Sequence, residues 1–372
     1  MTCEAFLERL YNYRNRLISS PRFQRWSLSN PLTRPIAQRR ARAALDLTAG
    51  FVYSQVLFAC AELDLFECLR EGSLSLQDLS KRLNLAEDPT SRLLAAAASL
   101  ELIERRGSCK WGLGPIGAAL AGNPSALALI RHQSMLYGDL IDPIALLKGK
   151  KSASLASYWP YSADEETPTL LGAEQVAAYS ALMAASQPIV AEEVLHAYDL
   201  TRYNCLLDVG GGEGVFIATA ARFSQRLNFK LFDLPAVAER ARERLQDMEL
   251  ASRVNIFEGN FLRDKIPSGA DIVTLIRIIH DHDDQSSITL LKNIRSSLEK
   301  GAKLLIIEAM SGVKGAEPLD AYYGFYTLAM GRGMPREVNH IKLLLTKSGF
   351  GACRLINNSL PTLTSILEAT AI

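Results

Sequence analysis

The chain has 372 residues, of which 48% are hydrophobic and 22% are charged, so it can bury a full globular core. The length allows about two or three domains, and the net charge of +1 by itself favours neither a nucleic acid nor a membrane as partner. The charge is unevenly spread. Residues 1–42 carry nine arginines and two glutamates, a net charge of +7, which leaves −6 on the remainder.

The six cysteines are scattered without a C-x-x-C pair, whereas a disulfide framework or a thiolate metal site needs tighter clustering. The first twenty residues are charged and lack the apolar core of a secretory signal. No run approaches the roughly 20 apolar residues of a membrane span. We therefore expect a protein of the reducing cytoplasm with no metal site.

Two long apolar helices are predicted in the first half of the chain. Residues 41–70 repeat apolar positions at helical spacing, with an interruption expected at Gly50. Their apolar side chains lie on more than one side, which is typical of a helix buried in a core or in a subunit interface. Together with a second apolar helix at 170–200, this segment predicts a large homodimer interface.

Residues 73–120 follow the order helix, helix, hairpin, which is that of a winged helix. Ser75 is placed to cap a short helix, and a second helix begins at Asp88. Residues 104–117 contain two short strands about a glycine-rich tip. A winged helix that reads DNA carries basic residues on its second helix, but residues 90–104 hold one arginine among many alanines and leucines. We expect this helix to pack against protein and not to bind nucleic acid.

From residue 204 onward, short strands alternate with helices. Each strand is a continuous apolar run, which is typical of a parallel sheet covered by helices on both faces. The chain closes with a predicted hairpin, which is unusual for a dinucleotide-binding fold. The predicted strands are 204–209, 228–233, 253–259, 271–279 and 303–310, the hairpin is 351–359 with 363–370, and the main helices are 215–227, 235–250 and 284–299.

A glycine-rich loop joins the strand 204–209 to the following helix. Glycines there let a ligand approach the backbone closely, and the helix N-terminus offers free N–H donors. At the end of the next strand, a carboxylate can accept both ribose hydroxyls of a nucleoside. The candidate nucleoside-binding residues are Asp208, Gly210, Gly211, Gly212, Gly214 and Asp233.

A dinucleotide-dependent oxidoreductase is the main alternative for this loop, and three features argue against it. The loop does not complete G-x-G-x-x-G, because Val215 stands three residues after Gly212. Asp208 would repel a pyrophosphate but would bind the ammonium group of a methionine. The closing hairpin is also foreign to the dinucleotide fold. S-adenosylmethionine is therefore the expected cofactor, and a simple tight turn is the remaining structural interpretation.

The motifs LLDVGGGEG, LFDLP, GNF, RIIHDHDD and LLIIEAM resemble those of the O-methyltransferase family that includes the plant phenolic and acetylserotonin enzymes. The resemblance covers nearly the whole chain. It implies an α/β fold in which a Rossmann-like class I methyltransferase domain follows an N-terminal helical, winged-helix dimerisation domain. We expect a basic arm at 1–42, a dimerisation region at 43–170 and a cofactor-binding domain at 171–372.

The resemblance also assigns cofactor roles to matching positions. The loop 210–214 would lie along the methionine part and Asp233 would bind the ribose. Asn260 and Phe261 would flank the adenine, and Arg277 would supply a basic contact near the cofactor. The family usually has Asp where Asn260 stands, but the carbonyl of Asn can also accept a hydrogen bond from the adenine amino group.

His280 follows an apolar strand, at the sheet edge where open α/β sheets bind ligands. A histidine can accept a proton near neutral pH, and methylation of an alcohol needs a base that takes the hydroxyl proton during attack. In the resembling family the matching histidine is this base. By the same resemblance, Asp281 matches the second residue of a His-Asp pair and Glu308 matches a supporting glutamate.

Two positions near His280 depart from the family pattern. The family's second glutamate falls at Met334 or Pro335, with Glu337 two or three residues away. His282 stands where the family has tryptophan. Both departures concern residues that would orient the histidine.

Two other interpretations of the run 280–284 stay open. His280 could be a solvated loop residue, or the run could hold a divalent metal. Neighbouring residues rarely all face one ion, and no other His/Asp cluster completes a shell. Asp283 and Asp284 also fit a helix cap and a first-turn acid.

Residues 22–66 resemble the hydroxyneurosporene (demethylspheroidene) O-methyltransferases of carotenoid biosynthesis in photosynthetic bacteria. This resemblance implies methylation of the tertiary 1-hydroxyl of an acyclic carotenoid, in spheroidene or spirilloxanthin synthesis. A small phenol or indole is the alternative acceptor. Side chains that could line an apolar substrate tunnel, or simply fill the core, are Tyr137, Met183, Met310, Tyr322, Tyr323, Phe325, Met330 and Met334.

The basic arm at 1–42 carries Phe23 and Trp26 among its arginines. Such a helix can rest on an anionic membrane surface, which suits a substrate dissolved in lipid. The alternative, which the sequence favours, is a solvated arm or one wrapped on a partner subunit.

Overall fold

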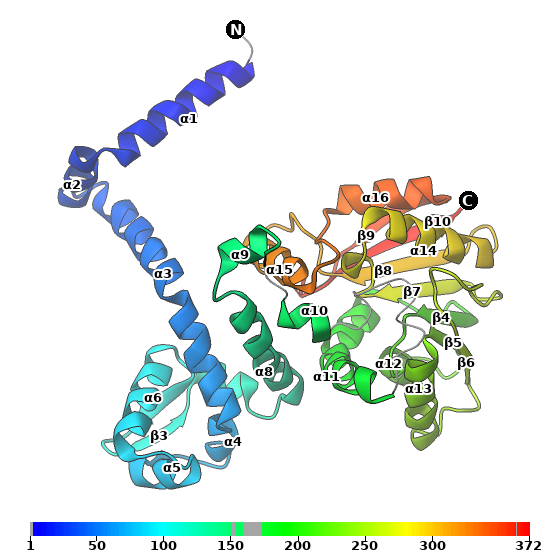
Figure 1. The fold of residues 1–372 in the computed structure, drawn as a ribbon, viewed down its shortest axis with the longest axis horizontal. Helices are drawn as coiled ribbons and strands as arrows, with labels where there is room; N and C mark the ends of the chain where they lie inside the picture. The colour runs from blue at the N-terminus through cyan, green and yellow to red at the C-terminus, as the bar shows by residue number, and fades with distance from the viewer. Residues whose placement is uncertain (1–2, 151–152, 159–172, 362) are drawn as a thin grey trace. The chain divides into compact units, whose positions relative to one another are not determined.

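The computed structural model describes residues 3–150, 153–158, 173–361 and 363–372. The chain forms two compact units, residues 1–122 and residues 123–372 (Figure 1). The domain boundary expected at residue 170 lies outside the described residues, as does most of the loop expected near 150–168. The three-part division stays a prediction.

The N-terminal unit begins with three helices, α1 (Cys3–Ser19), α2 (Pro21–Ser29) and α3 (Arg34–Glu62). Helix α3 runs through Gly50 without a break, so the interruption expected there is wrong. A glycine inside a helix costs only about 1 kcal/mol, which the other turns of a long helix outweigh. The chain turns instead at Asp64, where φ is 53°.

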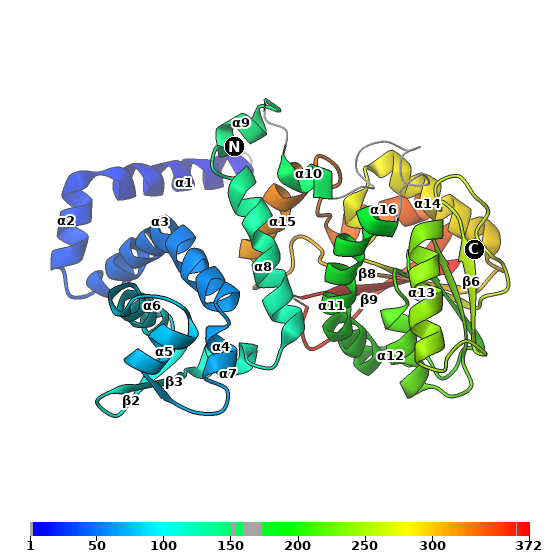
Figure 2. The same ribbon diagram turned by 60° about the horizontal axis from the view of Figure 1, so that its bottom comes forward.

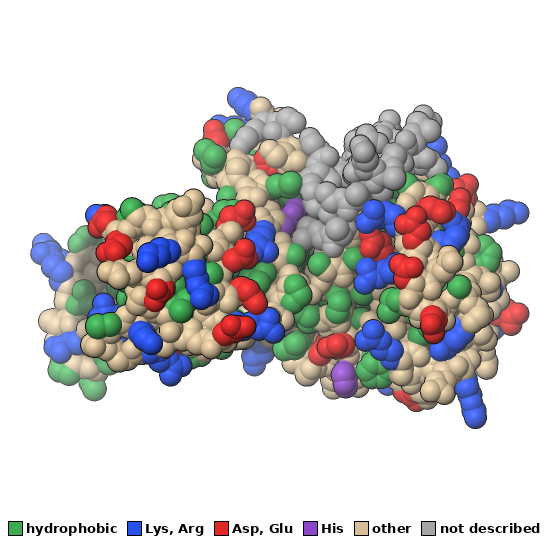
Figure 3. Space-filling model, turned by 90° about the horizontal axis from the view of Figure 1, so that it is seen from below, with side chains coloured by type: hydrophobic (Ala, Val, Ile, Leu, Met, Phe, Trp, Pro, Cys, Tyr) green, Lys and Arg blue, Asp and Glu red, His purple; other side chains and the backbone are tan. Residues whose placement is uncertain are grey.

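Helix α3 leaves much of its apolar surface uncovered within its unit. Leu47 is 86% exposed and Phe51 is 71% exposed. By length and composition alone, α3 is the one helix among those described that could span a membrane, whereas no such segment was expected. An exposed apolar surface of this kind marks an interaction site. Figure 3 shows hydrophobic side chains interspersed with cationic ones on the surface of this unit.

The rest of the N-terminal unit is the expected winged helix. Ser75 caps α5, because its hydroxyl accepts a hydrogen bond of 3.2 Å from the backbone N–H of Asp78. The tip of the hairpin holds Gly107, with φ of 65°. The three strands pair antiparallel in the order β1-β3-β2. The elements are α4 (Leu65–Cys68), β1 (Leu74–Ser75), α5 (Leu76–Arg82), α6 (Glu87–Ser99), β2 (Ile103–Arg106), β3 (Lys110–Leu113) and α7 (Pro115–Leu120).

The C-terminal unit is built on a seven-stranded sheet in the order β6-β5-β4-β7-β8-β10-β9. The first five of these strands are parallel, and β10 runs antiparallel to both of its neighbours. The predicted parallel sheet with a terminal antiparallel hairpin is confirmed. The strands are β4 (Cys205–Val209), β5 (Asn228–Asp233), β6 (Val254–Glu258), β7 (Ile272–Ile276), β8 (Lys303–Glu308), β9 (Phe350–Ile356) and β10 (Ser365–Ala371).

Apolar side chains fill both faces of this sheet, because successive residues of each strand point to opposite sides. Leu206 joins the cluster under α11, α12 and α13, and Leu207 joins the cluster under α14 and α16. Figure 1 shows these two groups of helices on opposite sides of the sheet, which is the doubly wound arrangement. The helices are α11 (Ala173–Ala197), α12 (Val215–Phe223), α13 (Pro235–Asp247), α14 (Asp284–Ser297) and α16 (Val338–Lys347).

Four further helices stand beside the sheet in the same unit: α8 (Pro124–Asp139), α9 (Pro143–Leu147), α10 (Ser154–Tyr158) and α15 (Glu317–Met330). Helix α8 packs on α11, and α10 packs on both α8 and α15 (Figure 2). Leu136, Leu155 and Met330 form their apolar core. These helices therefore build an apolar wall next to the carboxyl ends of the strands.

Candidate active site

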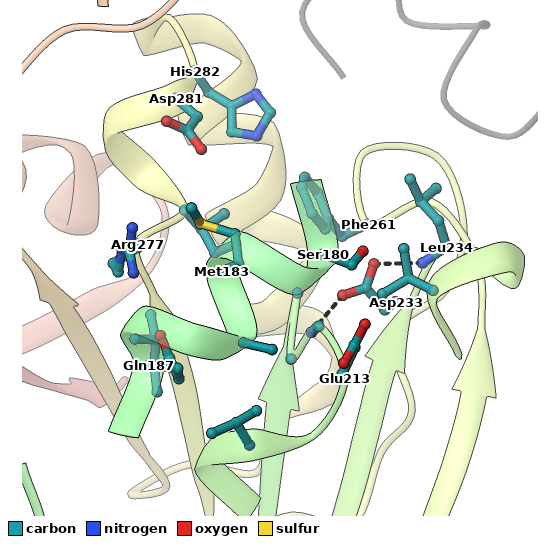
Figure 4. Close-up of a pocket in the computed structure, with 18 of the residues that line it drawn as sticks. Ser180, Met183, Gln187, Glu213, Asp233, Leu234, Phe261, Arg277, Asp281 and His282 are labelled. Atoms are coloured by element: carbon teal, nitrogen blue, oxygen red, sulfur yellow. Dashed lines mark hydrogen bonds between the residues drawn. The ribbon is translucent and has the colours of Figure 1, made fainter. Parts of the chain in front are cut away.

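A cavity lies over the carboxyl ends of β4, β5 and β7 (Figure 4). Parallel sheets bind ligands at this edge because the loops that follow the strands meet there. Most of the expected cofactor-binding residues line this one cavity, although they come from four segments of the chain. They are Gly210, Gly211, Gly212, Asp233, Asn260, Phe261 and Arg277.

The glycine loop allows a close approach to the backbone. Gly210 has φ of 70°, and a Cβ atom placed there would lie 2.5 Å from Cδ1 of Ile278. Its backbone N–H donates to the carbonyl of Phe232 at 2.8 Å, which ties the loop to β5. A side chain at this position would therefore displace both the loop and the wall of the cavity.

Asp233 presents a carboxylate to the cavity at the end of β5. Its oxygens accept hydrogen bonds from the backbone N–H groups of Gly212 at 2.8 Å and Leu234 at 2.7 Å, drawn dashed in Figure 4. Burial raises the pKa of Asp233 to about 6, although both hydrogen bonds oppose the shift. Each oxygen keeps a second lone pair, so the carboxylate can accept both hydroxyls of a ribose.

Asp208 lies behind the glycine loop and not in the cavity wall. It is 1% exposed, and its Oδ1 accepts a hydrogen bond of 2.6 Å from the hydroxyl of Thr274. Burial, together with the nearby charge of Asp233, raises its pKa to about 7. Its expected contact with a methionine ammonium stays a prediction, and Asp208 is placed to support the loop from below.

Asn260, Phe261 and Arg277 form the next part of the wall. The side-chain carbonyl of Asn260 already accepts a hydrogen bond of 2.9 Å from the N–H of Leu262, so one of its lone pairs is in use. Phe261 packs edge-to-face on His282, with ring centroids 5.5 Å apart. Arg277 has a positive φ of 60°, and its Nη1 donates to the hydroxyl of Ser186 at 2.6 Å.

His280 lies in a short 3-10 turn (Ile279–Asp281) between two carboxylates. Its Nδ1 is 3.4 Å from Oε2 of Glu308, and its Nε2 is 3.1 Å from Oδ1 of Asp281. Burial disfavours the charged imidazolium, but the two carboxylates outweigh it and raise the pKa of His280 to about 10. The expected trio is thus brought together. Asp281 lines the cavity, whereas His280, whose side chain is 16% exposed, is not among the lining residues.

Several cavity residues were not anticipated from the sequence. Glu213 lies in the glycine loop and is held by Arg240 at 2.6 Å and Arg244 at 3.4 Å. The sequence did contain a sign of this residue, because a charged side chain stands between two glycines of the ligand-binding loop. The other unanticipated wall residues include Ser180, Gln187, His282 and Arg332.

The remaining expectations near the site have mixed outcomes. Asp283 caps α14 by accepting from the N–H of Ser286 at 2.8 Å, as predicted. Of the tunnel candidates, Met183 and Met330 line the cavity, whereas Met310 is buried in the core beneath the sheet. Within the described residues, no group of three or more His, Cys, Asp or Glu side chains is placed to hold a metal ion.

Solved structures share this fold. CalO1, a methyltransferase of calicheamicin biosynthesis with SAH bound, matches with a TM-score of 0.73 and 25% identity over 90% of this chain and 99% of its own. Human N-acetylserotonin methyltransferase in complex with SAM gives a TM-score of 0.74 at 22% identity, over 89% of this chain and 97% of its own. The fold and the site together define an S-adenosylmethionine-dependent methyltransferase.

Residues 146–351 match the O-methyltransferase domain, and residues 45–122 match the O-methyltransferase dimerisation domain. The chain belongs to this O-methyltransferase family. The second match supports a homodimer and includes the exposed Leu47 and Phe51 of α3.

Among its relatives, demethylspheroidene O-methyltransferase of Cereibacter sphaeroides is 39% identical over 95% of this chain and 93% of its own length. The enzyme of the same name from Rhodobacter capsulatus is 38% identical over 96% of this chain and 89% of its own. Acetylserotonin O-methyltransferase of Mus musculus is 28% identical over 86% of both chains.

We expect the change Asp233→Ala to weaken S-adenosylmethionine binding by about 10- to 100-fold, because two hydrogen bonds to a charged acceptor are lost. Wild-type affinity should also fall as the pH drops through about 6, where Asp233 becomes protonated. Isothermal titration calorimetry measures both effects. Asp271→Ala is the control, since that carboxylate accepts from Cys205 at the opposite edge of the sheet. Unchanged affinity in Asp233→Ala would show that the nucleoside binds elsewhere.

Proposed function

We propose that this enzyme methylates the tertiary 1-hydroxyl of an acyclic carotenoid of the hydroxyneurosporene or demethylspheroidene type. The supporting observation is the 39% identity to a demethylspheroidene O-methyltransferase over 95% of the chain, against 28% to the acetylserotonin enzyme. The methionines 183 and 330 in the cavity wall suit a long apolar substrate. A small phenol or indole is the alternative acceptor.

The residues of the cavity fit S-adenosylmethionine. Gly212 faces open space, and the carboxylate of Asp233 keeps acceptor capacity for a ribose. Asp233 and the loop around Gly212 would hold the nucleoside and methionine parts, with Asn260 and Phe261 beside the adenine. The bound cofactor supplies a methyl group activated by a positively charged sulfur.

We propose that His280 acts as the general base that removes the hydroxyl proton of the acceptor. An alcohol is too weak an acid to ionise beforehand, so the proton must leave as the new bond forms. Glu308, on the Nδ1 side, holds the ring orientation and stabilises the imidazolium that results. Asp281, on the Nε2 side, lines the cavity, so the acceptor hydroxyl must replace this contact to reach Nε2.

The raised pKa of His280 keeps the ligand-free imidazole protonated at neutral pH. A positive charge placed in the cavity lowers the pKa of a neighbouring imidazolium. His280 is therefore expected to release its proton when the cationic cofactor binds, and to be ready to accept the proton of the acceptor.

The acceptor can be identified by incubating the protein with labelled S-adenosylmethionine and either hydroxyneurosporene or a panel of catechols. We expect label in the carotenoid, with the product a methyl ether at the tertiary carbon. Methylation of catechols alone would contradict the carotenoid assignment. That result would still agree with the assignment of the protein as a methyltransferase.

We expect His280→Ala to lower kcat by about 100-fold or more, while cofactor affinity does not fall, because the variant removes a cation that opposes the positively charged sulfur. The wild-type kcat/KM should fall as the pH drops below about 10, where His280 of the free enzyme becomes protonated, and this dependence should disappear in the variant. For a phenol of pKa about 10 the loss would be smaller, because a phenol ionises more readily. His196→Ala is the control, since His196 is exposed and its ring hydrogen-bonds to the carbonyl of Glu192 in its own helix, away from the cavity. Wild-type turnover in His280→Ala would exclude the base role.

We also propose that the protein is cytoplasmic and touches the membrane surface through its basic arm. Phe6, Leu10 and Leu17 lie on one side of α1 by helical spacing, and all three are exposed. Nine arginines in residues 1–42 add attraction to anionic lipid. This placement would bring the enzyme to a substrate that dissolves in the bilayer.

Sedimentation with vesicles tests the arm. Wild-type protein should bind phosphatidylglycerol vesicles, bind phosphatidylcholine vesicles weakly, and lose the difference at high salt. Leu10→Asp with Leu17→Asp should abolish binding, whereas Asn12→Asp, on the opposite side of α1, should reduce it only slightly. If the wild-type protein sediments with neither kind of vesicle, the arm instead packs on a partner subunit or is solvated.

A further inference from the structure

The segment Gly333–Arg336, named here the clamp segment, lies shortly after α15 and runs against the turn that carries His280. The backbone N–H of Met334 donates to the carbonyl of His280 at 2.9 Å. At its far end, the carbonyl of Arg336 accepts from the N–H of Ser311, just beyond β8. The clamp segment is therefore fixed to the residues that follow β8, the strand that ends at Glu308.

Arg336 is buried, with a side chain that is 0% exposed. Its Nη1 donates to the carbonyl of Ile279 at 2.7 Å, and its Nη2 donates to the carbonyl of His282 at 2.7 Å. These two carbonyls flank His280 and Asp281 in the chain. The planar guanidinium thus spans the turn and fixes both of its ends.

The charge of Arg336 is compensated at the start of α14. Its Nε donates to Oδ1 of Asp284 at 2.9 Å, and the other oxygen of Asp284 lies 2.9 Å from Nε2 of His340. A buried guanidinium without a carboxylate partner would be strongly destabilising. Asp284 is therefore more than a first-turn acid, since it allows Arg336 to stay under the turn.

Gly333 brings the clamp segment into direct contact with the turn. A Cβ atom at this position would lie 2.1 Å from the carbonyl oxygen of His280 and 2.9 Å from Cα of Asp281. No side chain fits there unless the turn moves. Gly331 has nearly the same backbone angle, with φ of 79° against 80°, but its nearest neighbour is Cβ of Ala156 at 4.0 Å.

We propose that Arg336 and Gly333 are positioning residues, which set the His280 turn at the place where the imidazole meets both the acceptor and Glu308. The clamp segment occupies the stretch where the resembling family has its second glutamate. In the family a carboxylate from this stretch would contact the histidine ring, whereas here the guanidinium of Arg336 binds the backbone of the turn. The inference rests on the proposed role of His280 as the base. A displacement of about 1 Å at a reacting group can cost up to about 100-fold in rate.

The first test compares Gly333→Ala with Gly331→Ala. Both changes put a side chain at the same strained backbone angle, so both should lower the unfolding midpoint, and Gly333→Ala should lower it further because of its clash with the turn. Only Gly333→Ala should lower kcat, by about 10- to 100-fold, and alter the pH dependence of the rate, while its affinity for S-adenosylmethionine stays within about twofold of wild type. Equal turnover in the two variants would overturn the proposal.

The second test compares Arg336→Lys with Arg253→Lys. Arg253 also donates to backbone carbonyls, those of Ser224 and Leu227, but at the opposite edge of the sheet. A lysine keeps the positive charge but lacks the planar set of N–H donors with which a guanidinium binds two carbonyls at once. Arg336→Lys should lower kcat and change the pH profile, whereas Arg253→Lys should lower stability alone. If both variants lose only stability, Arg336 is structural.

A double variant separates this inference from the proposed base. If Gly333 acts through His280, adding Gly333→Ala to His280→Ala should cause no further loss in kcat. Full additivity of the two losses would contradict the proposal. Wild-type activity in His280→Ala alone would instead contradict the role of His280 as the base. Low activity in His280→Ala together with wild-type activity in Gly333→Ala would contradict only the positioning role of the clamp segment.

Discussion

The site depends on the burial of carboxylates at the carboxyl edge of the sheet. Asp208, Asp233 and Glu308 lie at or next to the ends of β4, β5 and β8, and none is more than 9% exposed. An ionised carboxylate in such a place is costly unless hydrogen-bond donors or cations compensate it. The loop N–H groups, Thr274 and His280 do so only in part, because burial still raises the pKa of both aspartates. The edge is thereby suited to a cationic ligand, and the sulfonium of the cofactor supplies that charge.

Much of the fold follows from local patterns. The alternation of apolar strands with helices predicted the parallel sheet, and Ser75 and Asp283 predicted two helix caps that the structure contains. Gly50 was misleading because its helical neighbours outweigh its cost, whereas the real turn uses a left-handed Asp64. The exposed apolar surface of α3 could be predicted only as buried in a core or in an interface. The choice between them needs the structure, since periodicity does not say what covers a helix.

The site was predictable where function rests on residue type at a strand end. Asp233 was found in this way, whereas Asn260, Phe261 and Arg277 were assigned by the family resemblance. All four line one cavity. How deeply each carboxylate lies below the cavity was not predictable. Asp208 and Asp233 both lie near a strand end in the sequence, but only the structure shows that Asp208 is behind the loop. Long-range pairs were also hidden: nothing in the residues around Arg336 shows that its guanidinium reaches carbonyls more than fifty positions earlier in the chain.

The two carboxylates around His280 suit an acceptor that gives up its proton reluctantly. A base removes a proton more effectively as its own pKa rises, provided that it is neutral when attack begins. Glu308 and Asp281 raise the basicity of the ring, at the cost of keeping it protonated in the empty site. In the proposed mechanism, the positive charge of the cofactor lowers the pKa of His280 and so opposes this cost. A phenol needs a weaker base, but the phenolic enzymes that the chain resembles have the same His-Asp pair and supporting glutamate. The choice between an alcohol and a phenol is therefore made outside this cluster.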